Sequence, residues 1–369
     1  MGLNCGIVGL PNVGKSTLFS ALTSAPAEIA NYPFCTIEPN VGIVSVPDER
    51  IKKITEYIKP QKVIPAIVEF VDIAGLVKGA SKGEGLGNQF LGHIKQVGAI
   101  IHVVRCFQND DIIHVAGKID PIEDIDIINV ELAMADLETV TKRLQNLDKL
   151  IKSHDKEVSK RGKISKPILE NLKASLEKGI PARRLNLSPE DLDAVSDLHL
   201  ITLKKQLYLC NVDEDGISED NEFVKKVKEF AKSEGSEVVK ICGKFEAEIA
   251  ALGSEEEKKE YMESVGVSES GLAQLIKTGY KMLGLRTYFT AGEKEVRAWT
   301  IHEGDKAPQA AGVIHTDFEK GFIKAEIYSC EDLFKYGSEV KIKENGKFRI
   351  EGKEYVVQDG DVIHFRFNV

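Results

Sequence analysis

The residues best suited to chemistry lie near the start of the chain, in a glycine-rich run that ends in a lysine and a serine. Gly9, Gly14, Lys15 and Ser16 are spaced as G-x-x-x-x-G-K-S. Glycines at these positions let backbone N–H groups curl around phosphate oxygens, aided by the N-terminus of the following helix. The lysine then reaches the β- and γ-phosphates, and the serine hydroxyl is a ligand for Mg²⁺. The spacing predicts a phosphate-binding loop formed by Asn12, Val13, Gly14, Lys15, Ser16 and Thr17.

An aspartate and a threonine further along the chain are placed to complete a magnesium site. Asp72 ends an apolar run, and Gly75 follows it three residues later. An aspartate at the end of such a strand holds Mg²⁺ beside bound phosphates, and the glycine N–H is placed to contact the γ-phosphate. Thr36 lies between the two motifs, so we expect it to join the magnesium shell when its loop closes. The predicted metal ligands are Ser16, Thr36 and Asp72.

The elements that position these residues read as an α/β fold. Four apolar runs, 3–8, 66–72, 99–105 and 206–211, are typical of buried parallel strands. Strands that alternate with helical patterns predict a parallel sheet with helices on its faces. The stretch 75–92 holds six glycines, which suits a segment that becomes ordered when a γ-phosphate is bound.

The gap between the third and fourth strands has a helical pattern. Apolar residues in 133–151 step by three and four, as in a coiled-coil seam, and a second stripe covers 168–176. We expect an antiparallel helical hairpin joined at the basic turn 160–163. This hairpin is predicted to form an inserted domain, residues 129–198.

Charge is unevenly distributed along the chain. The net charge is −9, yet residues 142–184 hold 13 Lys or Arg against 5 Asp or Glu. That local excess favours either an anionic partner or an ordinary solvated helix surface. No apolar run reaches the 18 residues of a membrane span, no secretory leader is visible, and the six cysteines form no C-x-x-C pair. We therefore expect a reduced, cytoplasmic protein without a membrane partner.

The pattern of expected secondary structure changes near residue 284. Short strand patterns then alternate with turns and one or two short helices, which predicts a small α+β module. The expected strands are 296–301, 323–327, 348–350, 355–357 and 362–367, and the expected helices are 307–315 and 331–336.

Three motifs together resemble the YchF subfamily of Obg-related P-loop NTPases, the Obg-like ATPases. They are Asn12-Val13-Gly14-Lys15-Ser16-Thr17, Asn31-Tyr32-Pro33-Phe34-Cys35-Thr36 and Asp72-Ile73-Ala74-Gly75-Leu76. The resemblance implies a P-loop domain of Obg type at 1–128 and 199–283, a coiled-coil domain at 129–198 and a β-grasp TGS domain at 284–369. It also implies action on a nucleotide at the ribosome.

The base-recognition motif departs from that of ordinary GTPases. A guanine site carries Asn-Lys-x-Asp after its strand, whereas this chain has Asn211-Val212-Asp213-Glu214. Because a site built on hydrogen bonds discriminates strongly, loosening it should forfeit guanine selectivity. The resemblance likewise implies ATP, held by Asn211, Val212 and the loop at Cys242. Two alternatives remain open for Glu214, which either reads guanine or is a surface acid.

The water-orienting residue is a second departure. Leu76 stands where Ras-type enzymes carry a glutamine, and leucine cannot orient water. We predict His114 for this role, with His93 as the next candidate and His102 as a buried core residue. Asn12 further raises the hypothesis of K⁺ beside the phosphates, as in cation-assisted NTPases.

These observations predict a cytoplasmic, Mg²⁺-dependent ATPase that associates with the ribosome or ribosomal RNA. Lys15, Gly75 and His114 are the predicted catalytic residues, and basic side chains of the helical and C-terminal modules are the predicted RNA contacts, with no readout of DNA sequence. Two alternatives stay open: a true GTPase, and a nucleotide-gated binding scaffold with incidental turnover. A kinase is less favoured, because no acceptor-binding lid is evident. In the C-terminal module the candidate RNA contacts are Lys341, Lys343, Lys347, Phe348 and Arg349.

Overall fold

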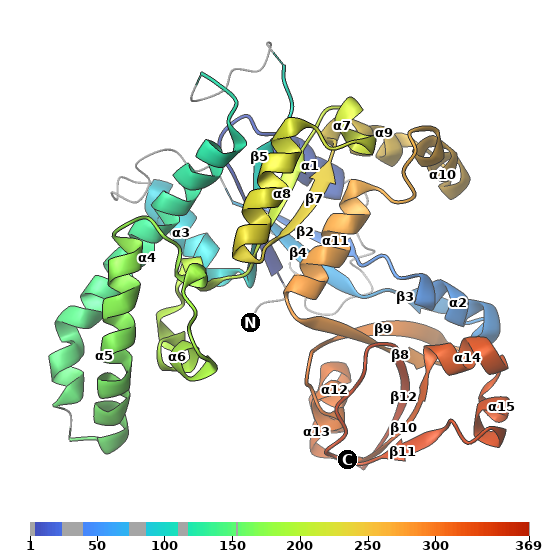
Figure 1. The fold of residues 1–369 in the computed structure, drawn as a ribbon. Coiled ribbons are helices and arrows are strands. Elements are labelled where there is room, and N and C mark those ends of the chain that lie inside the picture. The colour runs from blue at the N-terminus through green and yellow to red at the C-terminus, as the bar shows by residue number, and fades with distance from the viewer. Residues whose placement is uncertain (1–3, 24–39, 74–85, 110–116, 153, 369) are drawn as a thin grey trace. The chain divides into compact units, whose positions relative to one another are not determined.

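The computed structural model describes residues 4–23, 40–73, 86–109, 117–152 and 154–368 (Figure 1). The chain divides into two compact units. Of the described residues, the first unit comprises 4–23, 40–42, 70–73, 86–109, 117–152 and 154–275, and the second comprises 43–69 and 276–368. None of the helices among these described residues is long and apolar enough to cross a membrane.

A six-stranded sheet in the order β2-β4-β1-β5-β6-β7 organises the first unit. Neighbours in the series β1, β5, β6 and β7 pair in parallel, as the apolar runs predict. The boundary between the units falls within β2 and within β4. The strands are β1 (Asn4–Val8), β2 (Val41–Ser45), β4 (Ile67–Asp72), β5 (Ala99–Arg105), β6 (Gln206–Asn211) and β7 (Glu237–Ile241).

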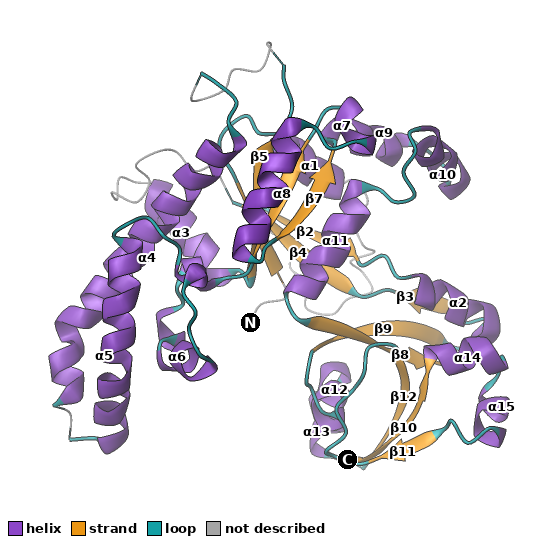
Figure 2. Ribbon diagram, viewed as in Figure 1, coloured by secondary structure: helices purple, strands orange, loops and turns teal. Residues whose placement is uncertain are grey.

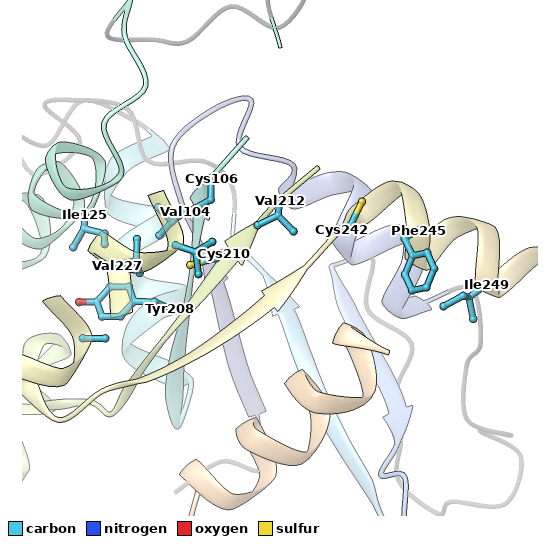
Figure 3. Close-up of a cluster of buried hydrophobic side chains, with 12 residues drawn as sticks. Val104, Cys106, Ile125, Tyr208, Cys210, Val212, Val227, Cys242, Phe245 and Ile249 are labelled. Atoms are coloured by element: carbon cyan, nitrogen blue, oxygen red, sulfur yellow. The ribbon is translucent and has the colours of Figure 1, made fainter. Parts of the chain in front are cut away.

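Burial explains the continuous apolar runs in the central strands. Every residue of β5 and β6 is buried, so these strands cannot alternate between apolar and polar residues. Val104 of β5, Cys106 directly after β5, and Tyr208 and Cys210 of β6 belong to one buried cluster with side chains of the flanking helices (Figure 3). This buried cluster therefore supports the carboxyl ends of β5 and β6, which lead to the predicted nucleotide site.

The helices of the first unit follow the strands in the α/β pattern (Figure 2). The helix α1 begins at Lys15 directly after the predicted phosphate loop, and α9 begins at Gly243 directly after β7. Apart from the helical insert, these helices are α1 (Lys15–Thr23), α3 (Leu86–Gln96), α7 (Asp215–Ser218), α8 (Glu222–Glu234), α9 (Gly243–Ala251) and α10 (Glu255–Ser264). The helix α11 (Gly271–Met282) begins in the first unit and belongs to the second from Ile276 onward.

The predicted helical hairpin is present as α4 (Pro121–Ile151) and α5 (Lys156–Leu176). The apolar seam forms a buried cluster with Val140, Leu147 and Leu172 among its members. The predicted turn at 160–163 is wrong, because those residues lie within α5. Asp155 caps this helix by accepting hydrogen bonds from the N–H groups of Glu157 and Val158, so α5 starts before the basic cluster.

Shorter elements lead from the hairpin back to the sheet. Ser188 caps α6 (Pro189–Ala194), with a reciprocal bond between the Asp191 side chain and the Ser188 N–H. Three 3₁₀ turns complete this path: η3 (Ala182–Arg184), η4 (Ser196–Leu198) and η5 (Ile201–Leu203).

The second unit contains another six-stranded sheet, in the order β11-β10-β12-β8-β9-β3. The central pair β12 and β8 is parallel, while β8–β9 and β10–β12 are antiparallel, which is the mixed sheet of a β-grasp fold. The predicted strand at 355–357 is wrong, since this segment makes only one isolated bridge, between Val356 and Lys306. The strands are β3 (Lys62–Ile64), β8 (Leu285–Ala291), β9 (Glu295–His302), β10 (Phe322–Ser329), β11 (Arg349–Glu351) and β12 (Asp361–Phe367), and the helices are α2 (Glu49–Ile58), α12 (Ala307–Ile314), α13 (Thr316–Lys320), α14 (Cys330–Tyr336) and α15 (Glu339–Glu344).

An N-terminal segment completes this second sheet. Strand β3 pairs in parallel with β9, and α2 packs on the same sheet. Arg50 of α2 lies 2.7 Å from the Asp359 carboxylate, and its guanidinium lies 5.4 Å from the centre of the Phe289 ring. Residues 43–69 therefore belong to the same compact unit as the C-terminal module.

Candidate active site

The loop between β1 and α1 has a backbone that requires its glycines. A Cβ atom on Gly9 would lie 2.7 Å from the Val103 carbonyl oxygen of β5, so the strand and the loop approach too closely for a side chain. Gly14 has a φ of 97°, and a Cβ there would lie 2.2 Å from Nδ2 of Asn211. Asn12 also has a left-handed backbone, with a φ of 61°. The loop therefore has the positive backbone angles and close contacts expected of a phosphate-binding loop.

Lys15 is buried at the first position of α1. Its ammonium group donates to the carbonyl oxygens of Gly9 at 3.0 Å and Leu10 at 2.7 Å. Burial lowers the pKa of this amine, and the negative charge of Asp72 opposes that shift. The cation is thus held inside the loop by the carbonyl oxygens of Gly9 and Leu10.

Asp72 ends the neighbouring strand β4 with an unsatisfied oxygen. Its Oδ1 atom is buried and has no hydrogen-bond partner within the described part of the chain. Burial raises the pKa of this carboxyl group, and Lys15 opposes the shift. A buried carboxylate oxygen of this kind fits a hard cation such as Mg²⁺, and the exposed Ser16 is the second residue of the adjacent helix α1. The third predicted ligand, Thr36, lies outside the described residues.

A pocket of about 480 Å³ opens beside the loop. Many of the predicted binding residues line it, whereas Val13, Lys15 and Ser16 are not among its lining side chains. Its walls come from the phosphate loop, the end of β5, the end of β6 and the start of α9. The lining residues are Asn12, Gly14, Thr17, Phe107, Gln108, Asn109, Asn211, Val212, Asp213, Glu214, Asp215, Cys242, Gly243 and Lys244.

The Asn211 side chain ties two of these walls together. Its Nδ2 donates to the Val13 carbonyl oxygen at 2.9 Å, and its Oδ1 accepts from the Gly243 N–H at 3.4 Å. This amide therefore braces the phosphate loop against α9. The base contact predicted for Asn211 stays a prediction.

The two acids after β6 both have partners. Asp213 accepts a hydrogen bond from the Gly216 N–H at 3.0 Å. Glu214 is exposed and forms an ion pair with Lys244 at 2.5 Å. The wall at Val212 is apolar, and the Val212 N–H donates to the Ile241 carbonyl oxygen at 2.8 Å. Glu214 also lines the pocket, so the two alternatives for this residue stay predictions.

One pocket wall was missing from the sequence-based prediction. Phe107 follows β5, and the buried Arg105 guanidinium lies 4.6 Å from the centre of its ring. Arg105 also donates to the carbonyl oxygens of Phe107 and Asn109, at 3.3 and 3.0 Å. The available signal was an arginine at the end of a buried strand, two residues before a phenylalanine.

The histidines divide into a core residue, an exposed residue and one that is not described. His102 is buried, its Nδ1 lies 2.9 Å from Nε2 of Gln206, and burial lowers its pKa to about 3. This confirms His102 as a core residue. His93 is exposed on α3. His114, like Gly75 and Leu76, lies outside the described residues, so its role in orienting water stays a prediction.

The parallel sheet, the glycine loop with Lys15 and the aspartate at the end of the adjacent strand define a P-loop NTPase. Two known families match the chain: residues 4–160 match a 50S ribosome-binding GTPase family, and residues 285–368 match the YchF-GTPase C-terminal family, described as a protein of unknown function. The chain belongs to the YchF family.

Relatives of known name cover the full chain. The ribosome-binding ATPase YchF of Bacillus subtilis is 58% identical, and that of Haemophilus influenzae is 55% identical, each over 100% of both chains. The structure of the Schizosaccharomyces pombe YchF GTPase matches with a TM-score of 0.88 at 42% identity, over 99% of this chain and 98% of that one. These matches confirm the resemblance found in the motifs and the predicted α/β class.

Proposed function

We propose that this chain is a Mg²⁺-dependent nucleoside-triphosphatase that hydrolyses ATP, with GTP as a weaker substrate, and that it acts on the ribosome. The arrangement of Lys15 and Asp72 carries the proposal, because it sets a buried cation and an unsatisfied carboxylate oxygen around a phosphate-binding loop. The two bacterial relatives are named ribosome-binding ATPases, which supports the same activity and partner.

Water attacks the γ-phosphate in line with the leaving diphosphate in this reaction class, so the protein mainly positions groups and stabilises charge. The loop N–H groups and Lys15 bind phosphate oxygens. Ser16, Asp72 and Thr36 would hold Mg²⁺, which supplies positive charge against the phosphates when it is bound. Gly75 would contact the γ-phosphate through its N–H, and His114 would orient the water; both roles follow from sequence position. K⁺ beside Asn12 completes the set of proposed ions.

Adenine is the proposed base because little at the base end of the pocket can read guanine. Both polar atoms of the Asn211 side chain bond within the protein, and Glu214 would have to leave Lys244 to accept from a guanine. Val212, Cys242 and the Phe107 ring are left to hold the base by packing and through backbone groups. Such contacts discriminate less than a buried acid does, so GTP remains a weaker substrate.

We further propose three working parts that follow the predicted division: the P-loop domain at 1–128 and 199–283, a helical arm at 129–198 and a TGS domain at 284–369. The excess of lysine and arginine in 142–184 supports an arm that contacts ribosomal RNA, because phosphate contacts dominate such binding. In the TGS domain the Lys343 ammonium lies 4.4 Å from the centre of the Phe348 ring, a basic and aromatic pairing suited to RNA. A ribosomal partner also implies a cytoplasmic location.

Replacing Lys15 tests the proposal. Lys15→Ala should lower ATP hydrolysis on the order of 1,000-fold, since the amine neutralises phosphate charge in the transition state. Circular dichroism should match the wild type. Lys232→Ala, an exposed lysine on α8, is the matched control and should keep full turnover. Undiminished hydrolysis by a folded Lys15→Ala variant would overturn the proposed activity.

Leu76 favours a second candidate, a nucleotide-gated scaffold whose turnover is incidental, because leucine cannot orient the attacking water. The effect of ribosomes on hydrolysis distinguishes the ATPase switch from the scaffold. An ATPase switch predicts that ribosomes accelerate hydrolysis, whereas the scaffold predicts different ribosome affinities for the ATP- and ADP-loaded forms without any acceleration.

A further inference from the structure

A buried carboxylate behind the pocket has no part in the proposed chemistry. Glu246 lies on α9, four residues after Cys242, and is 2% exposed. Its Oε1 accepts a hydrogen bond from the Gly271 N–H at 2.7 Å. Burial raises its pKa to about 7, while bonds from Gly271, Leu272 and Ser270 oppose that shift. Glu246 thus satisfies N–H groups at the start of α11.

The start of α11 is held unusually close to the end of β7. A Cβ atom on Gly271 would lie 2.7 Å from the Lys240 carbonyl oxygen and 3.1 Å from Oε1 of Glu246. Only glycine leaves room for this contact, since real Cβ atoms do not approach a backbone oxygen so closely. The position of α11 against β7 and α9 is therefore set by a close backbone approach and one carboxylate.

A small cavity of about 50 Å³ lies at this contact. Glu246 and Gly271 line it, and so do Val212 and Cys242. Val212 and Cys242 also line the 480 Å³ pocket at its base end. Val212 and Cys242 therefore line two cavities. One is the proposed base site, and the other is the small cavity that Glu246 and Gly271 also line.

We propose that Glu246 is a positioning residue for the nucleobase. By fastening α11 behind the Val212–Cys242 wall, it fixes the width of the base end of the pocket without touching the nucleotide. The inference rests on the proposed nucleotide-binding function. It assigns to Glu246 an effect on nucleotide affinity, whereas a purely structural tether would change stability alone.

Two variants disturb the contact from its two sides. Glu246→Ala removes the acceptor, and Gly271→Ala places a methyl group where the Lys240 oxygen and Glu246 leave no room. Both should raise the dissociation constant of ATP about tenfold, a loss of about 1.4 kcal/mol in binding free energy, and leave kcat at saturating ATP within about twofold. Glu246→Gln keeps one acceptor oxygen and should recover part of the affinity.

Glu248→Gln is the matched control. Glu248 lies on the same helix and accepts a hydrogen bond from the Tyr261 hydroxyl at 2.5 Å, and it lines neither cavity. This variant should bind ATP like the wild type. Binding is measured by calorimetry on the full chain with Mg²⁺ present, and melting temperature is recorded for each variant.

The outcomes distinguish failure of the positioning role of Glu246 from failure of the proposed nucleotide-binding function. If folded Glu246→Ala and Gly271→Ala bind ATP within twofold of the wild type, the positioning role is wrong even where the melting temperature falls. If Glu246→Ala does not fold, Gly271→Ala decides by the same criterion. A wild-type chain that binds neither ATP nor GTP would instead overturn the proposed function on which this role rests.

Discussion

Two aspartates of the first unit, one half-buried and one fully buried, show how a proposed ligand site differs from a structural joint. Asp72 ends β4 with an Oδ1 atom that has no partner among the described residues. Asp136, inside α4, accepts hydrogen bonds from the N–H groups of Ile201 and Thr202 at 2.9 and 2.7 Å, and from the Thr202 hydroxyl at 2.7 Å. Burial raises the pKa of both carboxyl groups.

The environments differ in whether the protein itself stabilises the charge. The donors around Asp136 belong to the turn η5, and the Thr202 hydroxyl in turn accepts from the Ala182 N–H at 3.1 Å, so this carboxylate fastens the base of the helical hairpin. The Asp72 Oδ1 atom has no such donor among the described residues. Buried polar atoms without partners are rare in folded proteins, and this one belongs to a carboxylate that interacts with the charge of Lys15 at the phosphate loop, where we propose that Mg²⁺ binds.

Removing the charge at Asp72 should have the largest effect on activity. Asp72→Asn should lower hydrolysis at least on the order of 100-fold, because Mg²⁺ loses an anionic ligand. Its melting temperature should stay equal or rise, since a buried charge is removed. Steady-state turnover across a Mg²⁺ series checks this, with Asp197→Asn, on an exposed ion pair, as control. If Asp72→Asn keeps its turnover within tenfold of the wild type, the proposed difference between Asp72 as a ligand residue and Asp136 as a structural residue is contradicted.

Removing Asp136 should cost stability instead. Asp136→Ala leaves buried N–H groups without an acceptor, which predicts a loss of about 3 kcal/mol in the free energy of unfolding. Urea denaturation measures the loss. Asp197→Ala breaks the exposed pair with Arg143 and should lose less than about 1 kcal/mol. If Asp136→Ala and Asp197→Ala lose equal free energies of unfolding, burial and hydrogen bonding do not determine how much Asp136 contributes to stability.

A buried histidine extends the comparison to pH. The pKa of His102 falls to about 3 in the folded chain, below the ordinary value of 6.5. The unfolded chain therefore binds a proton that the folded chain does not, and stability falls as pH drops below 6.5. Between pH 6.5 and 5 the loss should be about 2 kcal/mol. His102→Gln should flatten this slope, whereas replacing the exposed His93 should not; an unchanged slope in His102→Gln would contradict the assignment.

The sequence predicts the elements whose signals are local. The phosphate loop, the parallel strands, the helical seam and the core position of His102 all follow from spacing or apolar pattern within one segment. The helix start at Lys156 was missed because the Asp155 cap outweighs the basic run that reads as a turn.

Features set by distant partners could not be read from the sequence. Strand β3 has three residues and pairs with β9, more than 230 positions away, so no local pattern marks it as part of the C-terminal sheet. Asn211 shows its bracing role only once Val13 and Gly243 are in place. The Glu246–Gly271 contact depends in the same way on the end of β7.

The most direct test of the account is a titration of the nucleotide-free chain with labelled ATP, competed with GTP at matched Mg²⁺ and K⁺. The account predicts that ATP binds at least about tenfold more tightly, because Val212 replaces the guanine-site lysine and Glu214 is paired with Lys244. Tighter binding of GTP by the same margin would contradict it and make Glu214 the acid that reads guanine.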